Sequence, residues 1–166
     1  VGCIPTKTLV GSARVAYMAR QAASFGVEID GCIGVDMAAV KRRKDEVSGA
    51  SNAGVTQWLE GMENVELIRG HARFIGSHTV EVTGSMLEAE RIFINVGGRA
   101  RVPDWEGLDE VPFLTNANMM DVDFLPEHLV IVGGSYIGLE FAQMYRRFGS
   151  KVTVIEMQDR IIGRDD

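Results

Sequence analysis

The sequence predicts an α/β fold, and three observations lead to that prediction. Apolar residues recur at helical spacing near the N-terminus, short apolar runs alternate with polar residues between residues 64 and 95, and a strand–turn–helix–strand pattern begins at residue 129. The chain has 166 residues, enough for one full core or for pieces of two domains. We therefore expect helices first, then an antiparallel meander, then one βαβ unit of a parallel sheet.

The N-terminal part contains two predicted helices. The first covers residues 5–25 and ends at Gly26. The second begins at the N-cap Asp36 and continues past Gly49 and Gly54, each of which costs about 1 kcal/mol relative to alanine.

Four short strands and a linker follow. The strands are expected at residues 65–67, 72–75, 80–82 and 92–94, separated by glycine-containing breaks that include Gly84-Ser85. The domain linker is expected within residues 114–126.

The strand–turn–helix–strand pattern has the form of a dinucleotide-binding turn. An apolar strand at 129–132 leads into Gly133-Gly134-Ser135-Tyr136-Ile137-Gly138, a helix continues to Phe148, and a second strand covers 151–156. The first glycine permits a tight turn and the last permits close helix–strand packing. Ser135 replaces the middle glycine, so we expect weaker or slightly displaced nucleotide binding, although its hydroxyl can reach a phosphate.

Glu156 lies 23 residues after Gly133, at the end of the second strand. A carboxylate at this place accepts hydrogen bonds from the adenosine ribose and repels the additional phosphate of NADP. The sequence therefore predicts a preference for NADH over NADPH.

Cys3 stands at the start of the first helix, followed by Pro5 and Lys7. The helix dipole and a nearby ammonium group stabilise a thiolate, which makes such a cysteine reactive. The alternative is that Cys3 is a small packed residue in a turn.

Charge and composition exclude several classes of partner. The net charge of −6 argues against nucleic acid, and the basic run Lys41–Lys44 is followed at once by acidic residues, which indicates an exposed helix face. The chain has no apolar stretch long enough for a membrane span, and its three histidines lack metal-ligand spacing, so we expect no metal site. Two cysteines without CxxC spacing make the cytoplasm the expected compartment.

The segment Gly2-Cys3-Ile4-Pro5-Thr6-Lys7 resembles the redox-active helix start of the class I pyridine nucleotide-disulfide oxidoreductases, the FAD-dependent family of glutathione reductase, dihydrolipoamide dehydrogenase and mercuric reductase. The resemblance implies a partial, Rossmann-like FAD-binding domain at 1–120 that lacks its flavin-phosphate loop, and the start of an NAD(P)-binding Rossmann domain at 121–166. We accordingly expect the chain to be a fragment, inactive by itself, of a homodimeric enzyme that dimerises through a further C-terminal domain.

The same resemblance assigns roles to individual residues. Cys3 matches the second cysteine of a redox pair, and Lys7 with Glu140 matches an ion pair beside the flavin. The backbone at Ala72 matches the position that holds the flavin adenine, and Gly97-Gly98 matches a strand end that closes over FAD. Tyr136 matches the aromatic residue that covers the nicotinamide pocket.

These matches imply electron transfer from NAD(P)H through FAD to a cysteine pair, and then to a disulfide, a metal ion as in mercuric reductase, or a quinone. The alternative is a non-catalytic dinucleotide-binding module. A cysteine five positions before Cys3 would favour the enzyme.

Overall fold

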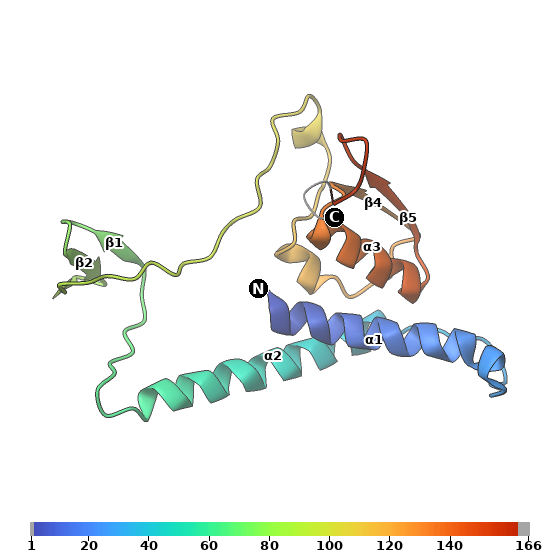
Figure 1. Ribbon diagram of the computed structural model, residues 1–166, viewed down its shortest axis with the longest axis horizontal. Coiled ribbons are helices and arrows are strands. Elements are labelled where there is room, and N and C mark those ends of the chain that lie inside the picture. Colours follow the sequence, from blue (N-terminus) through green and yellow to red (C-terminus); the bar gives the residue numbers. More distant parts are fainter. Residues whose placement is uncertain (1, 163–166) are drawn as a thin grey trace. The chain divides into compact units, whose positions relative to one another are not determined.

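A computed structural model describes residues 2–162 of the chain (Figure 1). Contacts divide the chain into two compact units, the first of Val1–Ala50 with Val102–Asp166 and the second of Ser51–Arg101. We describe each unit by itself. The predicted boundary between residues 120 and 121 concerns family domains rather than these compact units, and it stays a prediction.

Helices and strands follow one another in the order that the sequence predicts. The helices are α1 (Cys3–Gln21), η1 (Ala22–Phe25), α2 (Met37–Glu60), η2 (Leu108–Glu110), η3 (Asn118–Asp121) and α3 (Tyr136–Phe148). The strands are β1 (Ala72–Phe74), β2 (Thr79–Val82), β3 (Ser85–Glu88), β4 (His128–Val132) and β5 (Lys151–Ile155). None of the helices in this described part is long and apolar enough to cross a membrane.

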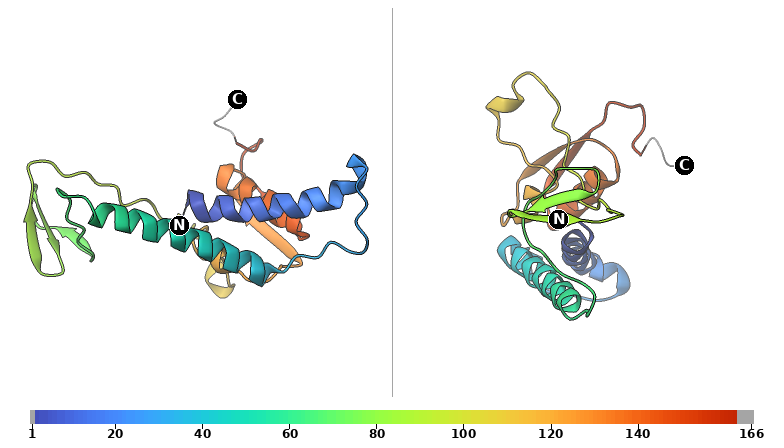
Figure 2. Two further views of the ribbon diagram at one scale, coloured as in Figure 1. Left: turned by 90° about the horizontal axis from the view of Figure 1, so that it is seen from below. Right: turned by 90° about the vertical axis from the view of Figure 1, so that its left-hand side faces the viewer.

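In the first unit, α3 lies between α1 and the sheet of β4 and β5 (Figures 1 and 2). Apolar side chains of α3 form the centre of the core, and Tyr145 and Phe148 meet edge to face with ring centroids 5.9 Å apart. Burial raises the pKa of Tyr145 to about 12. The buried apolar residues of this core are Leu9, Ala13, Ala16, Met37, Met119, Met120, Phe141, Met144, Tyr145 and Phe148.

Two polar contacts show that α1 and α3 run in the same direction. Near the N-terminus of α1, Lys7 forms an ion pair with Glu140 in the first half of α3. At the other end, the Arg20 guanidinium donates hydrogen bonds to the carbonyl oxygens of Arg147 and, at 3.0 Å, Phe148. This cation stands at the negative end of the α3 dipole, where it stabilises the helix. Both N-termini therefore lie at one end of the helix pair.

Strands β4 and β5 are parallel, with His128 opposite Lys151 and Val132 opposite Ile155. Since α3 connects them, residues 128–155 form the βαβ unit that the sequence predicts. Gly149 ends α3 at a φ of 132°, a backbone conformation that favours glycine.

The second unit contains a three-stranded antiparallel sheet in the order β1-β2-β3. Strands β1 and β2 agree with the prediction, but Ser85, expected in a break between strands, begins the unpredicted strand β3. Thr83 and Gly84 have φ values of 50° and 86° and form a tight hairpin turn, after which β3 begins.

The strands expected at residues 65–67 and 92–94 are absent from the described structure. The N–H of Val65 bonds back to the carbonyl of Met62 in a turn, and the side chain of Phe93 is exposed. A strand needs a neighbouring strand to take its hydrogen bonds, and a short apolar run does not reveal whether one is present.

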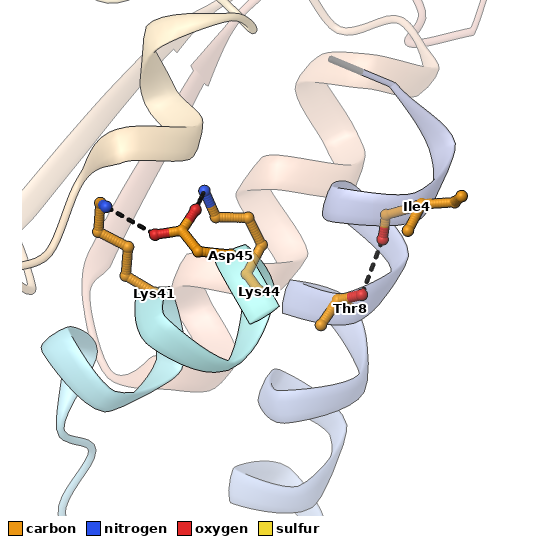
Figure 3. A network of polar contacts seen from close by, with 5 residues as sticks. All are labelled: Ile4, Thr8, Lys41, Lys44 and Asp45. Carbon is orange, nitrogen blue, oxygen red and sulfur yellow. Dashed lines mark hydrogen bonds and ion pairs between the residues drawn. The ribbon is translucent and has the colours of Figure 1, made fainter. Parts of the chain in front are cut away.

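The basic run on α2 is not one exposed face (Figure 3). Lys44 is buried and Lys41 half-buried, and both ammonium groups contact the Asp45 carboxylate, at 2.8 Å in the case of Lys41. Hydrogen bonds from Lys41, and then from Lys44, lower the pKa of Asp45. Arg43 reaches α1, where it donates to the carbonyl oxygen of Thr8 at 2.9 Å. Four consecutive residues point around a helix, so they cannot share one side.

We expect Gly49→Ala to stabilise the protein, because Gly49 lies inside α2 and a methyl group there meets open space. The gain should be roughly 0.5–1 kcal/mol in the free energy of unfolding, measured by urea denaturation. Gly26→Ala should instead lower the free energy of unfolding, because Gly26 has a φ of 75° that alanine adopts only with strain. Equal effects of the two substitutions would contradict this expectation.

Candidate functional site

The ion pair between Lys7 and Glu140 joins the two helices that carry the predicted motifs. Lys7 lies one turn after Cys3 on α1, and Glu140 lies one turn after Tyr136 on α3. The Lys7 side chain is 67% exposed and that of Glu140 is 25% exposed, so the pair lies at the surface with its carboxylate the more covered partner. The pair itself was expected from the family resemblance, and its role beside a flavin stays a prediction.

The parallel run of α1 and α3 brings two predicted sites to the same end of the helix pair. Cys3 is the first residue of α1 and is exposed. The glycine-rich turn leads directly into α3 at Tyr136. Cys3 and the glycine-rich turn, 130 residues apart in the sequence, therefore both lie one helical turn from the Lys7–Glu140 pair.

The glycine-rich turn between β4 and α3 is tightly folded. Gly133 has a φ of 108°, and its N–H bonds to the carbonyl of Ile155 at 2.8 Å. A Cβ on Gly138 would lie 2.1 Å from the Gly133 carbonyl oxygen, far inside any real contact. A Cβ on Gly134 would lie 2.9 Å from a methyl of Ile161. The positive φ of Gly133 favours glycine, and the backbone beside Gly138 leaves no room for a side chain.

The first turn of α3 offers backbone donors to an anion. Ser135 is the N-cap, is exposed, and its side chain makes no capping hydrogen bond. The amides at the start of a helix, Tyr136 and Ile137 among them, have no acceptor within the helix, and the helix dipole favours negative charge there. Tyr136 is 70% exposed. This arrangement fits a pyrophosphate group.

Glu156 contacts the turn directly. Its Oε2 accepts the N–H of Gly134 at 2.7 Å, and its Oε1 accepts the N–H groups of Met157 and Gln158 at 2.8 and 3.0 Å. The bonds from Gln158 and Gly134 are the main reason that the pKa of this carboxyl lies below its usual range. An ionised carboxylate is therefore fixed at the end of β5.

The residues expected on the FAD side lie in the second unit. Ala72 is the first residue of β1 and pairs with Val82. Gly97 has a φ of 70°, and both it and Gly98 have open space around a built Cβ. Since residues 92–94 form no strand, Gly97-Gly98 does not follow a strand end here. Their contact with FAD stays a prediction.

Sequence reasoning missed two arginines that hold α1 in place. Arg20 binds the C-terminal carbonyls of α3, and Arg43 binds the Thr8 carbonyl. Neither belongs to a motif, and an arginine that bonds to backbone oxygens leaves no pattern in a single sequence. Across residues 2–162 we find no group of three or more His, Cys, Asp or Glu side chains suited to a metal ion.

Comparisons with known proteins extend over the whole chain. The family described as pyridine nucleotide-disulphide oxidoreductase matches residues 1–166. A mercuric reductase of Bacillus cereus is 32% identical over 100% of the chain and 26% of its own length. A dihydrolipoyl dehydrogenase of Acholeplasma laidlawii is 36% identical over 97% of the chain and 49% of its own length.

A similar solved structure is the HOCl-induced flavoprotein disulfide reductase RclA of Escherichia coli, with a TM-score of 0.82 and 35% identity over 100% of this chain and 34% of that one. The chain thus spans between about a quarter and a half of the length of these relatives. The α/β architecture is that of a flavoprotein disulfide reductase. The predicted family is confirmed: the chain belongs to the pyridine nucleotide-disulphide oxidoreductases.

Proposed function

We propose that the whole protein is a flavoprotein oxidoreductase that accepts electrons from NAD(P)H and delivers them, through FAD and a cysteine pair that includes Cys3, to a disulfide, a metal ion or a quinone. The observation that carries the proposal is the Lys7–Glu140 ion pair. It joins the helix that begins at Cys3 to the helix that begins at the glycine-rich turn.

Bound FAD would supply a two-electron carrier between the nicotinamide and the cysteines. In this proposal the amides at the start of α3 bind the dinucleotide pyrophosphate, and Tyr136 covers the nicotinamide pocket. Lys7 is the cation beside the flavin ring, where it stabilises negative charge, and Glu140 orients it. Ala72, Gly97 and Gly98 are the backbone positions that would hold FAD.

Cys3 is the proposed thiolate that faces the flavin. It is exposed and lies at the N-terminus of α1. A disulfide between Cys3 and a second cysteine would accept two electrons and two protons and become two thiols. The second cysteine would then exchange with the substrate.

The proposal is tested by anaerobic titration of the whole, FAD-loaded protein with NADH. We expect loss of the oxidised flavin absorbance together with an increase of two titratable thiols per chain. Cys3→Ser should abolish this increase, because the remaining cysteine of the pair is then a thiol before and after reduction. A protein that binds NADH but contains neither a reducible flavin nor a disulfide would instead be the non-catalytic dinucleotide-binding module.

We expect NADH to reduce the flavin faster than NADPH does. The ionised Glu156 carboxylate stands beside the turn and repels the additional phosphate of NADPH. Stopped-flow reduction of the whole protein at equal concentrations of the two coenzymes measures the ratio, which should be about tenfold or more for a repulsion of at least 1.4 kcal/mol. Faster reduction by NADPH would contradict this preference.

We further propose that the whole protein is a cytoplasmic homodimer that forms through a C-terminal domain. Light scattering of the whole protein, and of a version that ends near residue 166, tests this assembly. The first should have the mass of a dimer and the second that of a monomer without bound FAD or turnover.

A further inference from the structure

The turn between β4 and α3 is held by the segment that follows β5. Gly134 uses both of its backbone polar groups on that segment: its N–H bonds to Glu156 Oε2 at 2.7 Å, and its carbonyl oxygen accepts the N–H of Ile162 at 3.1 Å. Ile161 packs against the same glycine, with a methyl 2.9 Å from the place of a Cβ. Residues 156–162 therefore fold back on the turn.

Glu156 fixes both sides of this contact. While Oε2 binds the turn, Oε1 binds the N–H groups of Met157 and Gln158 and so shapes the chain that leaves β5. Three backbone donors converge on one carboxylate, and hydrogen bonds to a charged acceptor are roughly twice as strong as neutral ones. A neutral amide in its place would offer only one acceptor atom.

We propose that Glu156 is a positioning residue for the dinucleotide turn, independent of any contact that it makes with a ribose. This inference rests on the proposed function of the turn. It has two consequences. The N–H of Gly134 is not a phosphate donor, so the pyrophosphate depends on the amides of α3. Substitutions at Glu156 weaken coenzyme binding through the turn, in addition to removing the charge that repels NADPH.

The first arm of the test concerns the protein without coenzyme. Amide hydrogen exchange of the whole, FAD-loaded protein is compared between wild type, Glu156→Gln and the control Glu28→Gln, which removes an exposed carboxylate from a loop. We expect peptides that contain Gly134, Met157 and Gln158 to exchange at least tenfold faster in Glu156→Gln only, with an unchanged melting temperature. Unchanged exchange in these peptides would overturn the proposal.

The second arm of the test distinguishes the positioning of the turn by Glu156 from a direct contact between Glu156 and the ribose. Dissociation constants are measured for NADH and for its analogue that lacks the adenosine 2′-hydroxyl. If Glu156 positions the turn, Glu156→Gln weakens both ligands by the same factor, about tenfold for the loss of a hydrogen bond to a charged group. A loss confined to NADH shows a ribose contact alone and overturns the proposal.

A shorter carboxylate is the second variant. Glu156→Asp keeps the charge but lacks one methylene group, so it cannot bind Gly134 and Gln158 together, and its exchange rates should fall between those of wild type and Glu156→Gln. If wild type binds neither coenzyme, the proposed function fails, whereas the exchange arm still decides whether Glu156 holds the turn.

Discussion

Lys7→Met is expected to slow flavin reduction by NADH by roughly 10²–10³-fold in the whole protein, the usual cost of losing one fixed electrostatic group at a reacting centre. Reduction adds negative charge to the flavin ring, and the proposed role of Lys7 is to stabilise that charge. The ion pair with Glu140 holds the Lys7 ammonium group in place before the reaction begins, so little free energy is spent on orienting it. Anaerobic stopped-flow absorbance at saturating NADH measures the rate.

Three further variants separate this role from a general loss of charge. Glu140→Gln keeps Lys7 but loses its charged partner, so the rate should fall less than in Lys7→Met. Lys7→Arg keeps the positive charge and should recover part of the rate. Lys151→Met removes an exposed lysine from β5 and should leave the rate unchanged. Equal rates in wild type and Lys7→Met would remove Lys7 from the mechanism.

Local patterns in the sequence predict most of this fold. The sequence marks both ends of the helical segment formed by α1 and η1. Gly2 precedes α1, and Gly26, in the left-handed region, ends η1. Part of the glycine-rich turn is equally local, since a side chain at Gly138 would meet the backbone of Gly133. The Lys7–Glu140 pair is different, because only the family resemblance linked residues so far apart in the sequence.

The predictions that failed depended on neighbours that are distant in the sequence. Residues 65–67 and 92–94 are apolar enough for strands but lack a partner strand in the described structure. Lys44 is a different case: its ammonium group contacts the adjacent Asp45 carboxylate and it is buried, which the charge pattern alone does not reveal. The contact of Glu156 with Gly134 depends on how β5 leaves the sheet, so the sequence predicted only its ribose role.

Gly138→Ala is expected to abolish tight coenzyme binding, with the dissociation constant for NADH raised at least roughly 100-fold, or about 2.8 kcal/mol. The methyl group would lie 2.1 Å from the carbonyl oxygen of Gly133 and 3.3 Å from a methyl of Ile131. Backbone on one side and a core side chain on the other prevent a small adjustment, so the start of α3 has to move away from β4. The amides that would bind pyrophosphate move with it. Calorimetric titration with NADH measures the loss.

The matched control is Gly49→Ala, the same substitution inside a helix where a methyl group meets open space. It should leave the NADH dissociation constant unchanged, and it separates the effect of the turn from the ordinary gain in helix propensity that alanine brings. Circular dichroism should show that Gly138→Ala remains folded, because most of the core formed by Tyr145 and Phe148 lies farther along α3. If folded Gly138→Ala bound NADH as tightly as wild type, the coenzyme would have to bind elsewhere. The proposal that the start of α3 binds the coenzyme would then be wrong.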